Sequence, residues 1–536
     1  MPATVAVVGV GPLGLMALKN LKEDGFAVTG FERRNWVGGV WKQSFDANLS
    51  TTANTVFNSS RFRSAIPDYP FPDDVDDFPT AKQLWKYFED YCDHFELRPR
   101  IRFGADVKNF ERKRGKWAVE YIQNGSLHTD YFDKLMIAPG SFVTPRSPKL
   151  EGVEAFQGKI LHSLNFPDPS TFQGQNVLLV GFHATAQDLV VELAPHAKKV
   201  YIAHKNGLIM MSRYGEDGRT YDQAQNLTAV FVQLFLETWL PSVWNWLFEK
   251  ILLSMSKKSY PNQRKEWNLS PAPPPTTTSP LIADAVYPHL ESGFAEPVAA
   301  IQQITGPKTI QLKDGRVLNN IDTIIFATGY EAKISYAPDE YNPYPIADEA
   351  PFLYRNIFPL HPDASVRNSL AFLGQGGIPF PGFVQFELKI WAISQIWQGK
   401  ASLPSFDTMQ QWHKDHMAWR QEVVRKSKFD SKFIIVFLRL PDHLKWLDKT
   451  AGTGILTHFS WFSWRSWRFW WQDRRFYNLC KSGLISPAMW RLFDMGGRKA
   501  WAGAKEQIIK DNEFADKRQQ ERLRAMGKVE ESRKDK

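Results

Sequence analysis

The feature that most constrains the fold is a glycine-rich turn between an apolar strand and a helix near the start of the chain. Residues 4–8 form a short run rich in β-branched side chains, and residues 9–14 follow with the spacing GxGxxG. A helix is predicted over 15–23, and a second strand over 27–31 leads to Glu32. In such a unit the glycines let the backbone approach a pyrophosphate, the helix start holds its charge, and the acid accepts ribose hydroxyls. This stretch therefore predicts a dinucleotide site.

A second unit of the same strand–turn–helix–strand plan spans residues 176–205. Gly181 opens its turn, but His183 and Ala186 stand where the second and third glycines would be. Alanine is tolerated at the third place, whereas histidine at the second adds bulk where the backbone should meet a pyrophosphate. Two such units predict an α/β fold with two Rossmann-like, three-layer dinucleotide-binding domains, each with its own nucleotide. We also expect a helical insert and an α-helical C-terminal tail.

The domain limits follow from changes in composition and pattern along the chain. We expect the first part of one nucleotide-binding domain over 1–166 and the second nucleotide-binding domain over 167–326. An aromatic-rich helical insert interrupts the latter at about 208–290. The first domain resumes over 327–405, and a helical, aromatic and basic region covers 406–536.

Bulk composition narrows the class of protein. The net charge of +9 suits an acidic surface such as phospholipid, or a phosphorylated cofactor; no nucleic-acid module is visible, so we expect no nucleic-acid partner. The two cysteines are far apart and form no CxxC pair, which excludes a disulfide reductase and fits reduced thiols in a cytoplasmic protein. We expect no signal peptide before the first strand, and no uncharged apolar run reaches the ~18–20 residues that span a bilayer.

Four stretches of the chain carry a family resemblance. They are the opening turn and its acid at 9–32, an Asn-containing loop at 58–61, the pattern FxGxxxHxxx followed by an aromatic at 156–166, and a strand end at 326–330. Together they resemble the flavin-containing monooxygenase family, class B flavoprotein monooxygenases of the dimethylaniline, N-oxide-forming type. The resemblance covers roughly residues 3–410.

This resemblance implies the chemistry of an enzyme. NADPH would reduce FAD, and dioxygen would then form a flavin C4a-hydroperoxide that oxygenates a small lipophilic substrate at nitrogen or sulfur. Two glycines and Trp41 after the first acid imply FAD at the first site. Asn58 is the expected catalytic residue beside the flavin, although asparagine in a loop is also typical of an Asx-turn. His162 is expected to organise the linker between the domains.

Lys205 stands where the family carries an arginine for the 2′-phosphate of NADPH. Because lysine lacks the bidentate fork, we expect a weaker preference for NADPH over NADH. No metal ligand is predicted. The predicted cofactor-binding residues are Gly9, Gly11, Pro12, Leu13, Gly14, Glu32, Arg33, Gly39, Val40, Trp41, Asn58, Val107, Gly181, His183, Ala184, Thr185, Lys205, Thr328 and Gly329.

Two alternatives stay open. Phe166 is followed by Pro167, which resembles the Baeyer–Villiger branch that inserts oxygen into ketones. His183 and Pro139 depart from the family turns and instead suit a degenerate flavin-binding, membrane-associated protein without NADPH turnover. The substrate and the oligomeric state are not determined by these patterns.

The aromatic segments have two interpretations. Residues 458–471 interleave tryptophan with arginine, and the insert segment 227–255 is apolar and aromatic. They are typical either of core helices or of a patch in the headgroup region of a membrane, where tryptophan and arginine are favoured. The second interpretation predicts peripheral or monotopic contact through the C-terminal Trp/Arg segment. It would place the protein on the cytosolic face of the endoplasmic reticulum, where similar family members often sit.

Overall fold

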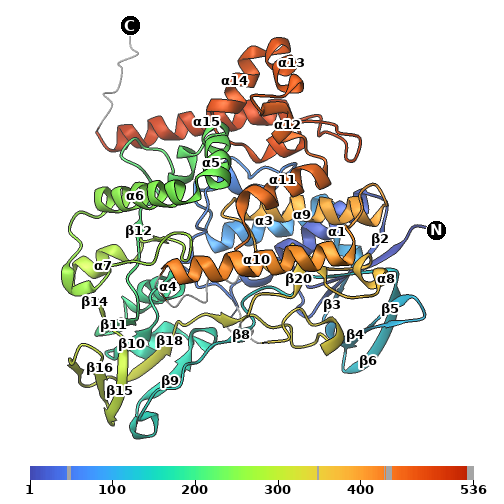
Figure 1. Cartoon of the computed structure of the whole chain (residues 1–536). Coiled ribbons are helices and arrows are strands. Elements are labelled where there is room, and N and C mark those ends of the chain that lie inside the picture. The colour runs from blue at the N-terminus through green and yellow to red at the C-terminus, as the bar shows by residue number, and fades with distance from the viewer. Residues whose placement is uncertain (45–49, 347–348, 428, 430–436, 528–536) are drawn as a thin grey trace.

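Two five-stranded parallel sheets are the framework of the molecule, whose ribbon is drawn in Figure 1. The computed structural model describes residues 1–44, 50–346, 349–427, 429 and 437–527. The first sheet, in the order β22-β7-β1-β2-β3, comprises β22 (Leu370–Phe372), β7 (Lys134–Ile137), β1 (Thr4–Val8), β2 (Ala27–Glu32) and β3 (Ile101–Phe103). The second, in the order β14-β11-β10-β18-β9, comprises β14 (Ala295–Ala299), β11 (Lys199–His204), β10 (Asn176–Val180), β18 (Thr323–Phe326) and β9 (Lys159–His162). The predicted pair of dinucleotide-binding units is confirmed.

Each parallel sheet is accompanied in the chain by a small antiparallel sheet. The first is β4 (Asp106–Lys113), β5 (Lys116–Gln123) and β6 (Ser126–Phe132). The second is β15 (Ile301–Gly306), β16 (Thr309–Leu312) and β17 (Val317–Leu318). β17 and β18 follow one another in the chain but belong to different sheets. Asn320, with φ at 59°, turns the chain between them.

Local signals set the helices of the first unit. Helix α1 (Pro12–Glu23) begins earlier than the predicted residue 15, because Pro12 suits the first helical turn, where its missing N–H costs nothing. Helix α3 (Ala81–His94) begins after Thr80, whose side chain accepts the Gln83 N–H while the Gln83 side chain accepts the Thr80 N–H. In the second unit, α4 (Ala184–Leu193) follows the turn at Gly181.

Two connections join the units side by side. Strands β8 (Thr144–Pro145) and β19 (Tyr330–Glu331) pair antiparallel, so the chain crosses to the second unit and returns along the same path. Strand β9 pairs with β18 of the second sheet, although the predicted boundary at 166 placed it in the first domain. The domain limits themselves stay a prediction.

The insert and the tail are helical, as Figure 1 shows in green and in orange to red. The insert contains α5 (Leu227–Trp239) and α6 (Pro241–Ser259), separated at Pro241. The tail contains α10 (Phe406–Ser427), α11 (Leu440–Ala451), α12 (Ile455–Phe459), α13 (Trp464–Gln472), α14 (Arg474–Ser482) and α15 (Ala504–Ala525). The apolar run at 433–438 lies largely outside the described residues, as does the charged end at 528–536. The remaining short elements are α2 (Arg61–Ser64), α7 (Tyr287–Glu291), α8 (Ala364–Arg367), β12 (Met210–Met211), β13 (Leu281–Ile282), β20 (Leu353–Tyr354) and β21 (Phe358–Pro359).

The tail shares its core with the first domain. Helix α9 (Gly382–Trp397) is buried along almost its whole length and packs against α1 on one side and α11 on the other. Leu388 and Trp391 of α9 belong to the same cluster as Leu444, Phe476 and other apolar side chains of the tail. Burial of this apolar surface makes the tail an integral part of the fold.

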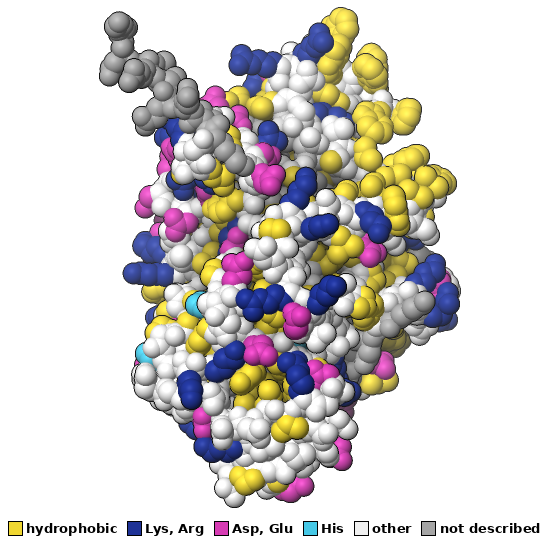
Figure 2. All heavy atoms as spheres, turned by 90° about the vertical axis from the view of Figure 1, so that its left-hand side faces the viewer, with side chains coloured by type: hydrophobic (Ala, Val, Ile, Leu, Met, Phe, Trp, Pro, Cys, Tyr) yellow, Lys and Arg dark blue, Asp and Glu magenta, His cyan; other side chains and the backbone are white. Residues whose placement is uncertain are grey.

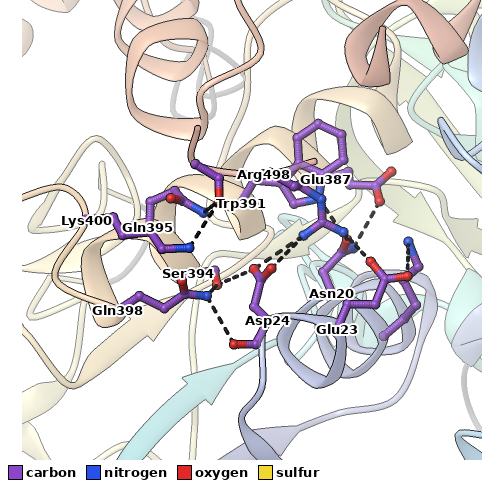
Figure 3. A network of polar contacts seen from close by, with 12 residues as sticks. Asn20, Glu23, Asp24, Glu387, Trp391, Ser394, Gln395, Gln398, Lys400 and Arg498 are labelled. Atoms are coloured by element: carbon purple, nitrogen blue, oxygen red, sulfur yellow. Dashed lines mark hydrogen bonds and ion pairs between the residues drawn. The ribbon is translucent and has the colours of Figure 1, made fainter. Parts of the chain in front are cut away.

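A buried polar network also ties the tail to α1 (Figure 3). Arg498 donates to Asn20 Oδ1 at 2.5 Å and to both Asp24 carboxylate oxygens at 3.3 Å, and its guanidinium lies 4.9 Å from the centre of the Trp391 ring. Asn20 in turn donates to Glu387 Oε1 at 3.0 Å. Arg498 and Asp24 are thus paired and hydrogen-bonded, which lowers the penalty for burying them.

Candidate functional site

The first glycine turn has no room for side chains at two of its positions. A Cβ on Gly14 would lie 1.9 Å from the Gly9 carbonyl oxygen, and a Cβ on Gly9, whose φ is 89°, would lie 2.3 Å from the Ala138 carbonyl oxygen. Strand β1, the turn and helix α1 therefore close on one another only with glycine there.

The start of α1 is open to an anion. Its cap residue, Gly11, provides no side-chain acceptor, and no acidic residue occupies the first turn of the helix. The first N–H groups of a helix lack partners within the helix and carry partial positive charge. Gly39 lies backbone to backbone with Gly11, since a Cβ on Gly39 would be 3.3 Å from Gly11 Cα. The turn and the following loop thus form one backbone-lined surface.

Glu32 ends β2 beside this surface. Its Oε2 accepts the Val10 N–H at 2.9 Å and its Oε1 accepts the Arg34 N–H at 3.0 Å. Burial raises the pKa of the Glu32 carboxyl, while these two hydrogen bonds lower it. The Arg34 guanidinium donates to the Gly39 carbonyl at 3.0 Å, which holds the loop against the turn. The acid is therefore fixed in place with lone pairs remaining for further donors.

The other predicted residues of the first site lie near this turn or at strand ends. Val40 and Trp41 follow Gly39 in a short 3₁₀ turn, and Arg33 is exposed beside Glu32. Val107 is buried in β4, in the same apolar cluster as Phe31 of β2. These residues of the predicted first site therefore lie around the ends of β1 and β2.

The second turn repeats the geometry of the first. A Cβ on Gly181, whose φ is 104°, would lie 2.6 Å from the Ala327 carbonyl oxygen, which matches the relation of Gly9 to Ala138. His183 caps α4 through its backbone alone, and its ring nitrogen Nε2 lies 3.1 Å from the Ser279 carbonyl oxygen. Burial lowers the pKa of His183. The His183 ring therefore points toward the insert, where the neutral imidazole donates to the Ser279 carbonyl.

Around the second turn, Ala184 and Thr185 open α4, and Lys205 follows β11 with an exposed side chain. The Thr328 hydroxyl donates to the Arg146 carbonyl, and the Gly329 carbonyl accepts the Arg146 N–H at 3.0 Å. These contacts lie where the two connections between the units run side by side.

His162 lies at the same crossing. Its Nε2 contacts the Gly329 carbonyl at 3.1 Å, and its Nδ1 accepts the Leu164 N–H at 3.0 Å. These partners select the neutral tautomer with the proton on Nε2. Burial lowers the pKa of His162, which favours the same neutral form. The residue ends β9, a strand of the second sheet, and ties it to the returning connection; its role in organising the linker stays a prediction.

Asn58 lies in an exposed loop that reaches the second unit. Two residues on the same loop contact α4: the Thr55 hydroxyl donates to Asp188 at 2.8 Å, and Asn54 donates to Glu192 at 3.0 Å. Burial raises the pKa of the Asp188 carboxyl to about 6. The loop therefore bridges the first domain to the helix that starts at the second turn.

Sequence reasoning missed the residues that hold this loop. The Tyr221 hydroxyl donates to the Asn58 carbonyl at 2.6 Å, and Asp222 accepts the Ser60 N–H at 2.8 Å. One local signal was available: Thr220 and Gln223 have the spacing of a capping box, which marks a tight turn at this point of the insert.

Both turns fit a dinucleotide. Each has a glycine pressed against the carbonyl of a neighbouring strand, and each leads to a helix whose first turn has no side-chain cap and no acidic residue. Backbone N–H groups at such helix starts are suited to the pyrophosphate of FAD or NADPH. Within the described residues, none of the helices combines the length and apolar character needed to cross a bilayer.

Comparison with known proteins agrees with this architecture. The sequence model of the FMO-like family, described as flavin-binding monooxygenase-like, matches residues 3–529. The match runs through the tail, beyond residue 410, where the predicted resemblance ends.

Individual relatives cover much of the chain. The monooxygenase aurF of Gibberella zeae is 31% identical over 526 residues, 95% of this chain and 97% of that protein. The N-oxide-forming dimethylaniline monooxygenase 2 of Pan troglodytes is 30% identical over 419 residues, 76% of each chain. Among solved structures, S-allyl-L-cysteine S-oxygenase from Allium sativum aligns with a TM-score of 0.59 and 19% identity over 95% of this chain and 99% of that one, a likeness of fold.

Proposed function

The chain belongs to the flavin-binding monooxygenase-like family, and from that premise we propose that it oxygenates a small lipophilic substrate at nitrogen or sulfur. Membership of the family makes it an oxidoreductase that uses FAD, NADPH and dioxygen. The name of the N-oxide-forming relative supports nitrogen as the first atom to test. The observation that carries the proposal is the pair of matching glycine turns, each at an uncapped helix start.

We assign the first turn to FAD and the second to NADPH. The N–H groups at the start of α1 would hold the FAD pyrophosphate, and Glu32 would accept its ribose hydroxyls. The start of α4 would hold the NADPH pyrophosphate, and Lys205 would attract the 2′-phosphate as a point charge. A bound flavin, reduced by NADPH, would supply the activated oxygen for the reaction.

In this proposal Asn58 and His162 act by positioning other groups. The exposed Asn58 amide carries both donors and an acceptor, so it can orient the reacting groups between the two sites. His162, neutral and hydrogen-bonded on both ring nitrogens, keeps the two connections in register and has no free nitrogen for proton transfer.

The proposal is tested by products. The purified protein is supplied with FAD, NADPH and air, and then with N,N-dimethylaniline, a dialkyl sulfide or cyclohexanone in separate reactions. We expect an N-oxide or a sulfoxide. Formation of a lactone alone would instead establish the Baeyer–Villiger alternative that Phe166 and Pro167 motivate. Flavin that NADPH cannot reduce at any concentration would establish the degenerate alternative.

We also propose that the aromatic patch contacts an anionic phospholipid surface. Lys481 lies 4.7 Å from the Phe231 ring of the insert and 5.3 Å from the Trp461 ring of the tail, which brings these two segments together. Figure 2 shows exposed hydrophobic side chains gathered near the top of the molecule. Phe462 is 94% exposed and Trp471 82%, and arginines flank them. The exposed aromatic residues of these segments are Phe235, Trp239, Trp246, Trp461, Phe462, Trp464, Trp467 and Trp471.

Tryptophan and arginine at one surface favour the headgroup region, of which the predicted cytosolic face of the endoplasmic reticulum is one example. Sedimentation with phosphatidylserine vesicles, compared with phosphatidylcholine vesicles, tests this. We expect binding that falls with salt and with the double change Trp464→Ser, Trp471→Ser. Equal recovery in the supernatant with and without vesicles would remove the proposal.

A further inference from the structure

The loop that carries Asn58 is held from outside its own domain. The Tyr221 hydroxyl donates to the Asn58 carbonyl at 2.6 Å, and Asp222 Oδ2 accepts the Ser60 N–H at 2.8 Å. Arg63, just beyond the loop, donates to the Asp222 carbonyl at 2.7 Å. The backbone around Asn58 is therefore attached to one turn of the insert, and the Asn58 side chain is left exposed.

That turn is rigid for local reasons. The Thr220 N–H donates to the Gln223 side chain at 2.7 Å, and the Thr220 hydroxyl donates to Asp222 Oδ1 at 2.7 Å. The Tyr221 ring stacks on Phe78 with 6.2 Å between ring centres. Asp222 thus has both carboxylate oxygens engaged, one inside the turn and one on the Asn58 loop.

A second attachment runs through Asp77, which is 6% exposed. The Asp77 carbonyl accepts the Arg61 N–H at 2.8 Å, at the far end of the Asn58 loop. Its carboxylate accepts hydrogen bonds from Arg518, at 3.0 Å, and from Arg522, both on α15. Arg522 Nε also donates to the Gly218 carbonyl of the insert at 2.6 Å. Helix α15 is therefore joined to the Asn58 loop and to the insert at once.

We propose that α15 and the insert turn at 214–222 position Asn58, and so set how much activated oxygen reaches substrate and how much is lost as hydrogen peroxide. Tyr221, Asp77 and Arg522 are the positioning residues. This inference rests on the role proposed above for Asn58.

The physical reason is the precision that the reaction demands. A loop segment held by a few hydrogen bonds opens more readily when one of them is lost, and a misplacement of about 1 Å can cost on the order of a hundredfold in a catalysed step. A displaced loop also admits water, which favours loss of activated oxygen as peroxide. The contacts come from the insert and from the C-terminal helix, so the position of Asn58 depends on both.

The test uses Tyr221→Phe in the full-length holoenzyme, with Tyr131→Phe as the matched control, since Tyr131 is 54% exposed on β6. Loss of one hydrogen bond predicts that the displaced loop becomes roughly two- to tenfold more populated. Amide hydrogen exchange over 57–64 should rise by that factor, and peroxide released per NADPH oxidised should at least double. The rate of anaerobic flavin reduction by NADPH should not change, and the variant should stay folded, with a loss of unfolding free energy no larger than that of one hydrogen bond. Unchanged exchange and unchanged peroxide release would overturn the inference.

Arg522 provides the second comparison. Arg522→Lys keeps a positive charge near Asp77 but cannot also bond the Gly218 carbonyl, so we expect an intermediate rise in peroxide, with a larger rise for Arg522→Gln. An equal effect of both variants on unfolding with no effect on peroxide would assign Arg522 a purely structural role and contradict the inference.

Asn58→Ala separates the two proposals. If it leaves peroxide release unchanged, the role of Asn58 fails; if it raises peroxide while Tyr221→Phe does not, only the positioning inference fails.

Discussion

Replacing Glu387 by glutamine is expected to change how stability depends on pH. The carboxyl is fully buried on α9, where Oε1 accepts from Asn20 and Oε2 has no hydrogen-bond partner in the part of the chain that the structure describes (Figure 3). Burial, and then the negative charge of Asp68, raise the pKa of Glu387 from 4.5 to about 7, against the opposing charges of Lys19 and Arg498. The folded protein therefore binds a proton that the unfolded chain releases between these two pH values.

The sign and the size follow from linkage. The stability contributed by protonated Glu387 is fully present below pH 4.5 and is lost as pH rises to about 7. At 1.36 kcal/mol per pH unit, the whole window corresponds to about 3 kcal/mol, of which about 2.5 kcal/mol falls between pH 5 and pH 8. Glutamine keeps the acceptor for Asn20 but cannot ionise, and its unpartnered amide N–H₂ costs about 1–3 kcal/mol at every pH.

The assay is denaturant unfolding of Glu387→Gln and wild type at pH 5, 6, 7 and 8, followed by tryptophan fluorescence. Glu154→Gln, at an exposed position, serves as the control. The variant should be less stable than wild type at pH 5, and the difference should move in its favour by about 2.5 kcal/mol by pH 8. A difference that stays constant across this range would refute the reasoning about the buried carboxyl.

Three further outcomes are expected. Gly14→Ala should weaken FAD binding at least tenfold, about 1.4 kcal/mol, because the added Cβ would overlap the Gly9 carbonyl. The control Gly306→Ala, where a Cβ meets only ordinary contacts, should bind FAD normally. Equal FAD titrations for the two variants would contradict the assignment of the first turn to FAD. Lys205→Ala should raise KM for NADPH far more than KM for NADH, with Lys198→Ala as an exposed control; equal effects on both nucleotides would remove the 2′-phosphate role. Arg355→Lys should lower the free energy of unfolding by about 1–2 kcal/mol. The Arg355 guanidinium lies within 5.5 Å of the centres of three aromatic rings and donates through two nitrogens to the Asp442 carboxylate, which lysine cannot reproduce. An unchanged unfolding curve would show that these guanidinium contacts do not stabilise the fold.

The parts of the fold that sequence could predict are those set by near neighbours. The turn at 9–14 and the second unit around Gly181 are each determined within a few residues, and the structure has them where the patterns predict them. The cap at Thr80 is set just as locally, by Gln83 three residues later. The spacing of the leucines predicts too late a start for α1, because the helix begins at Pro12, before its first leucine repeat.

Contacts between distant segments could not be predicted. Tyr221 is 163 residues from Asn58, and Arg522 is 445 residues from Asp77, so no local pattern joins them. The helical composition of the tail likewise indicated helices but not that they share a core with α9. For the same reason, the sequence does not decide whether the aromatic run at 458–471 is buried or exposed. In the structure Phe459 is buried in the core and Trp464 is exposed.

The central claim is that two backbone turns hold a flavin and a nicotinamide nucleotide in one chain. It is tested most directly by the absorbance spectrum of the purified protein after addition of FAD, recorded before and after NADPH under anaerobic conditions. The account predicts a yellow protein whose flavin absorbance bleaches with NADPH and returns when air is admitted. A folded protein that stays colourless with excess FAD would contradict it.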